Sequence, residues 1–507
     1  MKKQAFNPYL PSWEYIPDGE PHVFGDRVYV YGSHDRANGA VFCLGDYVCY
    51  SAPVDDLSDW RYEGVIYKKE QDKANDGRMV LYAPDVTRGS DGRYYLYYVY
   101  DKISIVSVAV CDTPAGKYEF YGYVHYKDGT RLGERKGDMA QFDPAVLTEG
   151  KNTYLYTAFC GQNMTDRIGA MATVLDEDML TIKEEPVVIV PGCLYSLPEA
   201  EAKEKAESKA KEISCPYKLD SVQNWAGYKN HAFFEASSIR KINDKYYFVY
   251  SSEVCHELCY ATSDKPTGDF VYGGVIVSNC DLGIDSYKKA DVPVVPAANN
   301  HGGIVKIKDD YYIFYHRHTN NTWFSRQGCA EKIHIEPDGK IKQAEITSCG
   351  LNGGALKGEG EYGAYLACHI FTDEPTAYVT DLYPHITQDG SDNDDGSPFG
   401  VENYDGTNGV DTSYIAYIKD KTTIGWKYFD FKGVKKVCVK ARGYFHGHFE
   451  VRNSFNGEVL GKIELGDTSD FWEERGAEIA LPDGVSAFYL TFSGSGTGQL
   501  KSIRFEC

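Results

Sequence analysis

The sequence lacks any long apolar run. Within its 507 residues, no stretch approaches the roughly 20 consecutive apolar residues that cross a bilayer. The first residues, MKKQAFNP, carry two lysines but not the apolar segment of a secretory signal peptide. We therefore expect a cytoplasmic protein that does not insert into membranes.

Positive charge is also scarce. Lys and Arg total 53 against 74 Asp and Glu, so the formal net charge is −21 at pH 7. Phosphate backbones and anionic lipids repel such a chain, which argues against nucleic-acid and membrane partners. Neutral sugars remain compatible with it. The 14 cysteines show neither zinc-site nor disulfide-framework spacing, and we interpret them as reduced thiols.

Tyrosine, in contrast, is abundant, with 42 Tyr beside 23 Phe. A turn followed by a tyrosine-rich strand recurs five times, at residues 25–31, 91–97, 150–156, 243–250 and 309–315. The repeats lie roughly 60 to 90 residues apart, which leaves room for the four strands of a propeller blade. The sequence therefore predicts an all-β fold that begins with a five-bladed β-propeller over residues 1–345.

Each repeat also carries one ionisable residue ten or eleven positions before a tyrosine of its strand. These residues are Asp18, Asp85, Asp143, Glu235 and His301. The innermost strands of a propeller surround its axis, so we expect the five side chains to converge on one pocket. Converged carboxylates raise one another's pKa and are typical of catalysis or cation binding. Inverting glycoside hydrolysis uses such a pair, about 6.5–9.5 Å apart.

At these residues the sequence resembles glycoside hydrolase family 43, a family of five-bladed propellers that act on arabinans and xylans. The resemblance covers residues 6–345. It rests on Asn7-Pro8, Ala83-Pro84-Asp85-Val86, Phe142-Asp143-Pro144-Ala145-Val146, Phe234-Glu235-Ala236-Ser237, His301-Gly302-Gly303 and Tyr315-His316-Arg317.

The resemblance implies three catalytic residues. Asp18 would be the general base, Glu235 the general acid, and Asp143 the carboxylate that raises the pKa of the acid and orients it. Glu20 is an alternative base because it precedes a proline, as the base of the family usually does. The register to Tyr29 favours Asp18, since a shift of two strand residues moves a carboxyl by roughly 6–7 Å.

The resemblance also implies the substrate-binding residues. Asp85 and Arg326 would hold sugar hydroxyls, Glu20 would lie nearby, and Trp225, Trp323 or Trp13 would offer a stacking surface. His301 would contact substrate, or hold a structural calcium ion through water, or be a hydrogen-bonded core histidine. No cofactor is required for the chemistry.

A second domain is expected over residues 350–507, where short alternating strands predict a jelly-roll-like β-sandwich. It resembles carbohydrate-binding module family 6, but Gly498-Gln499-Leu500-Lys501 replaces the usual ligand segment, so sugar binding by this domain stays open. The acidic loop 389–395 is either solvated or a calcium loop. Residues 199–213, rich in Glu, Lys and Ala, predict a solvated helix or flexible excursion.

Together these features predict an inverting hydrolase that releases terminal pentose from arabinose- or xylose-containing hemicellulose oligosaccharides. An α-L-arabinofuranosidase, with β-D-xylosidase as a second activity, fits best. An endo-arabinanase and a non-catalytic sugar-binding propeller remain alternatives.

Overall fold

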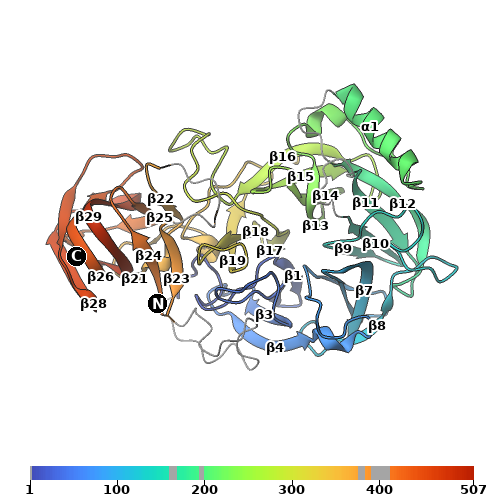
Figure 1. Ribbon diagram of the computed structural model, residues 1–507, viewed down its shortest axis with the longest axis horizontal. Helices are drawn as coiled ribbons and strands as arrows, with labels where there is room; N and C mark the ends of the chain where they lie inside the picture. The colour runs from blue at the N-terminus through green and yellow to red at the C-terminus, as the bar shows by residue number, and fades with distance from the viewer. Residues whose placement is uncertain (1–2, 159–167, 193–198, 375–378, 380–382, 390–411) are drawn as a thin grey trace.

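Five antiparallel sheets surround a common axis in the first two thirds of the chain (Figure 1). The computed structural model describes residues 3–158, 168–192, 199–374, 379, 383–389 and 412–507. The blades are β1–β4 (Glu20–Phe24, Arg27–Tyr31, Tyr47–Pro53, Arg61–Tyr67), β5–β8 (Asp85–Arg88, Tyr94–Tyr100, Ile103–Cys111, Glu119–Tyr123), β9–β12 (Ala145–Glu149, Asn152–Thr157, Gly169–Leu175, Ile182–Pro191), β13–β16 (Phe233–Ile242, Lys245–Ser252, Glu257–Ser263, Val271–Ser278) and β17–β19 (Ile304–Ile307, Asp310–His318, Arg326–Ile333).

The innermost strands close a ring, because β1, β5, β9, β13 and β17 each pack against their two neighbours. The prediction of an all-β fold with a five-bladed propeller is confirmed. The tyrosines fill the spaces between and within blades; most of the largest fully buried side chains, such as Tyr31, Tyr97 and Tyr156, are tyrosines. Their abundance therefore reflects core packing more than sugar binding.

The turn between the first two strands differs in one blade. We number the blades I to V in chain order. In blades I, III, IV and V two residues separate the paired strand ends, and the first of them has a left-handed φ, for example 65° at Gly25 and 56° at Asn243. In blade II the five residues 89–93 separate Arg88 from Tyr94. Because of this longer turn, a residue at a given distance before the strand tyrosines lies nearer the end of its innermost strand in blade II than in the other blades.

The N-terminal segment closes the propeller. The backbone N–H of Tyr9 donates to the carbonyl oxygen of Gly328 in β19 at 3.3 Å. The side-chain amide of Asn7 donates to the Ala330 carbonyl oxygen at 3.0 Å and accepts from the Ala330 N–H at 2.9 Å. The first residues of the chain thus lie along the last strand of the ring.

The predicted helix is present as α1 (Glu199–Glu212), between blades III and IV at the rim of the propeller (Figure 1). Ala202, Ala206 and Ala210 repeat every four residues and are buried against the core, while the charged residues face outward. No helix of the described residues has both the length and the apolar character needed to cross a membrane.

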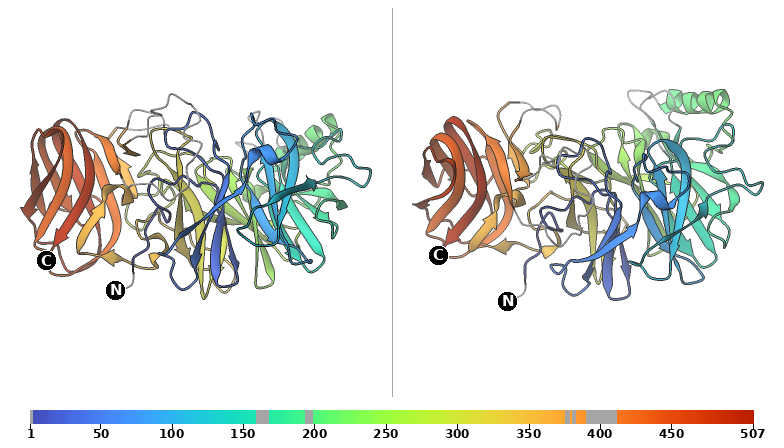
Figure 2. Two further views of the ribbon diagram at one scale, coloured as in Figure 1. Left: turned by 90° about the horizontal axis from the view of Figure 1, so that it is seen from below. Right: turned by 60° about the horizontal axis from the view of Figure 1, so that its bottom comes forward.

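A second sheet-rich body lies beside the propeller (Figures 1 and 2). Its strands are β20 (Leu356–Lys357), β21 (Gly360–Gly363), β22 (His369–Phe371), β23 (His385–Gln388), β24 (Ser413–Ile418), β25 (Thr423–Phe431), β26 (Lys436–Arg452), β27 (Gly461–Leu465), β28 (Ser469–Glu478) and β29 (Gly484–Glu506). They enclose a separate apolar core centred on Trp426 and several phenylalanines.

The long strands β26 and β29 differ from the expectation of several short ones. All of β26 pairs with residues 489–506 of β29, and glycines along both strands allow close backbone approach. A Cβ at Gly496, whose φ is 84°, would meet the carbonyl oxygen of Tyr444 at 1.8 Å. The acidic loop predicted over residues 389–395 lies outside the described residues from position 390 onward.

The two bodies meet through a buried polar cluster. Lys427 of β25 is 1% exposed and lies 3.2 Å from Asp281 and 3.1 Å from Glu345, both in propeller segments. His369 of β22 lies 3.6 Å from Asp281 and accepts or donates a 3.1 Å hydrogen bond with Tyr287. Burial opposes ionisation of Asp281, but His369 and Lys427 lower its pKa to about 2.

Candidate active site

A cavity of about 380 Å³ opens at the end of the propeller axis where the innermost strands begin. Its wall combines carboxyl groups, one guanidinium and several aromatic rings. The lining residues are Asp18, Phe42, Tyr82, Phe142, Asp143, Phe234, Glu235, Cys255, Asn299, His301, Trp323 and Arg326. Six of the residues predicted from the sequence are therefore together here: Asp18, Asp143, Glu235, His301, Trp323 and Arg326.

Each of the three acids stands beside a strained backbone position before or within an innermost strand. Asp18 and Asp143 have φ values of 57° and 42°, and both lie two residues before a strand. Glu235 is followed by Ala236 with φ 68°, in a bulge that shifts the register of β13. Left-handed backbone at non-glycine residues is costly and is typical of functional sites. It turns these side chains out of the sheets and into the cavity.

Asp18 is the most firmly held of the three. It is 4% exposed, and its Oδ1 accepts from Nη1 of Arg326 at 2.8 Å. Arg326 is in turn fixed by Asp35, which accepts from its Nε at 2.8 Å and from its Nη2 at 3.0 Å. One buried guanidinium thus contacts two carboxylates and sets the orientation of Asp18.

Asp143 holds a proton more readily than an ordinary aspartate. It is 5% exposed, and burial together with the negative charges of Glu235 and Asp18 raises its pKa well above the usual value. The N–H of Ala236 donates to its Oδ2 at 3.0 Å, which opposes this rise only in part. Glu235 itself is half-buried and faces the cavity. A negative charge on either of Asp143 and Glu235 therefore opposes ionisation of the other.

His301 lies between the two aspartates. Its Nδ1 is 3.8 Å from Asp18 and 3.7 Å from Asp143. Burial lowers its pKa to about 4, so the ring is neutral at pH 7. Its Nε2 has no hydrogen-bond partner within the described part of the chain.

Three residues expected to bind substrate do not line this cavity. Glu20 begins β1 on the channel side and pairs with Arg240 at 2.7 Å, while Asp85 accepts from the Val146 N–H at 2.8 Å and lies 2.6 Å from His22. Both carboxyls are buried, with 1% and 0% exposure. Trp225 is packed in the core between blades III and IV.

The position of Asp85 follows from the longer turn of blade II. Asp18, Asp143 and His301 each stand six residues before the last residue of their innermost strand, whereas Asp85 stands three residues before it. The sequence prediction counts residues back from the strand tyrosines, and that count includes the longer turn, so it gives Asp85 the same place as the other residues. The equivalent position in blade II is Tyr82, which does line the cavity.

Other lining residues gave no signal in the sequence. Phe42 lies under the guanidinium of Arg326, with the ring centroid 4.7 Å from Cζ, and Phe324 packs edge-on against Phe42 at 4.7 Å. Oδ1 of Asn299 accepts a 2.8 Å hydrogen bond from Nε2 of His318. These residues come from loops whose path depends on long-range packing.

A calcium ion near His301 would be held through water, as expected from the sequence, because the side chains there offer few direct ligands. Calcium takes six to eight oxygen ligands, whereas Asp18 is already paired with Arg326 and His301 offers only nitrogen. Deeper in the channel, Glu20, His22 and Asp85 are close enough to share an ion, but Arg240 lies 2.7 Å from Glu20 and 3.5 Å from His22. The guanidinium supplies the positive charge there.

Comparison with known proteins identifies the family. The family model described as glycosyl hydrolases family 43 matches residues 21–212, from the first blade to the end of α1. A xylosidase/arabinosidase of Thermoclostridium stercorarium is 60% identical over 512 residues, which cover 99% of each chain. The chain belongs to glycosyl hydrolase family 43. It is therefore a glycoside hydrolase, and the cavity with its three acids is the candidate active site of this family 43 enzyme.

Two further matches are more distant. A xylosidase/arabinosidase of Bacteroides ovatus is 30% identical over 368 residues, which cover 66% of the family 43 chain and 96% of the relative. A family 43 arabinoxylan arabinofuranohydrolase from Bacillus subtilis, solved with cellotetraose, covers 98% of this chain and 97% of its own at 18% identity, with a TM-score of 0.48.

Proposed function

We propose that the protein is an inverting glycosidase that releases terminal pentose units, as an α-L-arabinofuranosidase with β-D-xylosidase activity. The observation that carries the proposal is the cavity in which three blades contribute Asp18, Asp143 and Glu235. The names of the two xylosidase/arabinosidase relatives support a pentoside substrate. The aromatic wall suits the apolar face of a sugar ring.

Asp18 acts as the general base. Its carboxyl, held in place by Arg326, accepts a proton from a water molecule as that water attacks the anomeric carbon. Glu235 acts as the general acid and protonates the leaving oxygen. Its half-buried side chain lines the cavity, which suits contact with the leaving group.

Asp143 keeps the proton on the pair that it forms with Glu235. Repulsion between the two carboxylates is mutual, so the pair retains one proton to a higher pH than an isolated carboxyl would. The N–H of Ala236, the residue after Glu235, donates to Asp143 and fixes the two relative to each other. No step requires a metal ion, and we expect hydrolysis to persist in a chelator.

The test is release of nitrophenol from nitrophenyl α-L-arabinofuranoside and nitrophenyl β-D-xyloside, with the anomer of the first product followed by NMR. We expect release from both and a β-anomer from the α-arabinoside. An α-anomer would contradict inversion. Cleavage of linear arabinan without release from either small substrate would favour an endo-arabinanase, and binding without release would favour a sugar-binding propeller.

We also propose that the enzyme works in the cytoplasm on short imported oligosaccharides. All cysteines of the described residues are free thiols, which suits a reducing compartment. Cell fractionation followed by activity measurement tests this. Activity confined to the culture medium would contradict it.

A further inference from the structure

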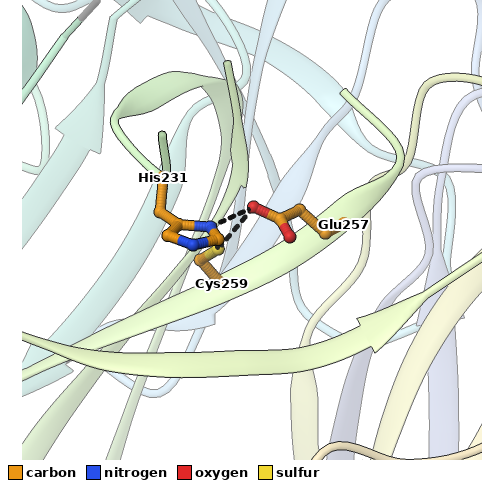
Figure 3. A group of neighbouring side chains, drawn as sticks. All are labelled: His231, Glu257 and Cys259. Carbon is orange, nitrogen blue, oxygen red and sulfur yellow. Dashed lines mark hydrogen bonds and ion pairs between the residues drawn. The ribbon is translucent and has the colours of Figure 1, made fainter. Parts of the chain in front are cut away.

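A second cluster of chemically distinctive side chains lies on blade IV, apart from the candidate active site (Figure 3). Glu257 and Cys259 stand two residues apart on β15, so their side chains share one face of the strand. His231 reaches them from the segment before β13, and Figure 3 shows its ring directed at the Glu257 carboxylate. Nitrogen, oxygen and sulfur thus meet at one point.

The three potential ligand atoms are close to a metal-binding arrangement. Nδ1 of His231 is 2.6 Å from Oε1 of Glu257 and 3.9 Å from Sγ of Cys259, and Oε1 is 3.3 Å from Sγ. A tetrahedral zinc ion, with bonds of about 2.0–2.3 Å to such ligands, separates them by about 3.3–3.6 Å. On this geometry the His231–Glu257 separation has to widen by less than about 1 Å, and the His231–Cys259 separation has to shorten by a few tenths of an ångström.

The surroundings resemble those of a protein metal site. Ser252 donates a 2.6 Å hydrogen bond to Glu257, and the His231 ring stacks on Tyr272 at 5.1 Å. Such contacts orient ligands. Cys259 and Glu257 are buried, whereas the His231 side chain is 33% exposed. An ion therefore has a route from solvent, and a water molecule can complete its coordination.

We propose that His231, Glu257 and Cys259 bind one divalent transition-metal ion of the zinc class. One thiolate, one imidazole and one carboxylate are a ligand set that suits zinc and cobalt and disfavours calcium and magnesium. Binding requires that the thiol proton leave to solvent. Burial and the negative charge of Glu257 raise the pKa of Cys259, so an ion with high affinity for sulfur is needed.

The site has a structural consequence for the active-site cavity. His231 lies four residues before Glu235 along the chain, and Glu257 lies two residues after Cys255, which lines the cavity. A bound ion would tie these two segments together at the base of blade IV. This link between the two segments does not depend on the identity of the substrate.

The experiment uses Co²⁺ as a spectroscopic probe of the full-length, metal-free protein. We expect a thiolate-to-cobalt charge-transfer absorption and visible bands of a four-coordinate ion, saturating at one equivalent and abolished by an equivalent of Zn²⁺. Cys259→Ser should remove the charge-transfer band. His231→Gln, at a partly exposed position that tolerates substitution, should weaken cobalt binding by about tenfold or more.

Two controls separate this site from adventitious binding. Cys111→Ser removes a half-buried thiol on blade II, and His334→Gln removes a solvent-exposed histidine that lies 3.7 Å from Glu336 without a thiol beside it. Both should leave the spectrum and the affinity unchanged. Absence of the band in the parent protein, or its persistence in both Cys259→Ser and His231→Gln, would overturn the proposal.

Discussion

At the scale of single residues, the choice of general base depends on where two neighbouring carboxylates point. Asp18 faces the cavity, whereas Glu20, two positions later, faces the channel and pairs with Arg240. We expect Asp18→Asn to lower kcat by about 10²–10⁴-fold, since the attacking water loses its base. The matched variant Glu20→Gln should keep most activity but lower the thermal midpoint, because it leaves the partly buried Arg240 without its charge partner.

Initial rates on a nitrophenyl pentoside and thermal melts of both variants check this prediction. If Glu20→Gln abolished hydrolysis while Asp18→Asn remained active, the assignment of the base would be reversed.

The second residue-scale prediction concerns the pH profile. Asp143 and Glu235 repel each other when both are ionised, so the pair resists loss of the one proton that catalysis needs. In Asp143→Asn the remaining carboxyl loses its proton at a lower pH. We expect the basic limb of the kcat/KM profile to move to lower pH, with a smaller loss at acidic pH than at neutral pH. An unchanged basic limb would show that Asp143 does not influence the proton of Glu235.

The site was predictable from the sequence where local spacing mattered. Asp18 and Asp143 stand at the same place relative to a short turn, and Glu235 stands one residue further from its turn, where a bulge in β13 takes up the extra position. The same counting gave Asp85, because the five-residue turn of blade II cannot be seen in residue spacing alone. Asp35 and Phe42 were not predicted, since only folding brings their loop to Arg326.

At the scale of elements, the loop between β18 and β19 depends on the second domain. This loop carries Trp323 of the cavity wall. The N–H of Asn320 donates to the carbonyl oxygen of Ile386 at 2.8 Å, and the hydroxyl of Thr387 donates to the Asn320 side chain at 2.6 Å. Strand β23 therefore holds the loop in place.

Thr387→Val removes that hydroxyl and retains the shape of the side chain. We expect KM to rise several-fold while kcat changes less, because the loop shapes the sugar site without taking part in proton transfer. Thr423→Val is the control, since it breaks a 3.0 Å hydrogen bond to Thr491 within the second domain. Equal kinetic constants for Thr387→Val and the parent enzyme would show that the loop keeps its conformation without the Thr387 hydrogen bond.

The blades were predictable for a related reason: each is a local meander whose turn and tyrosines recur. The sandwich was harder to divide, because β26 and β29 each continue through glycines where the sequence suggested separate strands. Pairing between strands distant in sequence determined their length.

At the scale of the whole molecule, the polar interface predicts a loss of stability in acid. Burial and the charge of Lys427 lower the pKa of His369 to about 4, against 6.5 for an ordinary histidine. Below about pH 6.5 the unfolded chain binds a proton that the folded protein does not. Stability is therefore complete above pH 6.5 and falls as the pH approaches 4, by about 3 kcal/mol for this group.

Thermal midpoints at pH 7 and pH 5 measure this effect. The difference between them should shrink in His369→Gln and stay unchanged in the exposed control His334→Gln. A pH dependence identical in all three proteins would show that His369 does not contribute.

The closure of the ring by Asn7 and Tyr9 has a consequence for synthesis on the ribosome. Their partners, Gly328 and Ala330, are more than three hundred positions downstream. At about 5–20 residues per second, the opening segment waits roughly 15 to 60 seconds before its docking strand is translated. Late in that interval, once residue 278 has been translated, the first four blades lack the fifth that completes the ring, and we expect their outer apolar faces to bind chaperones.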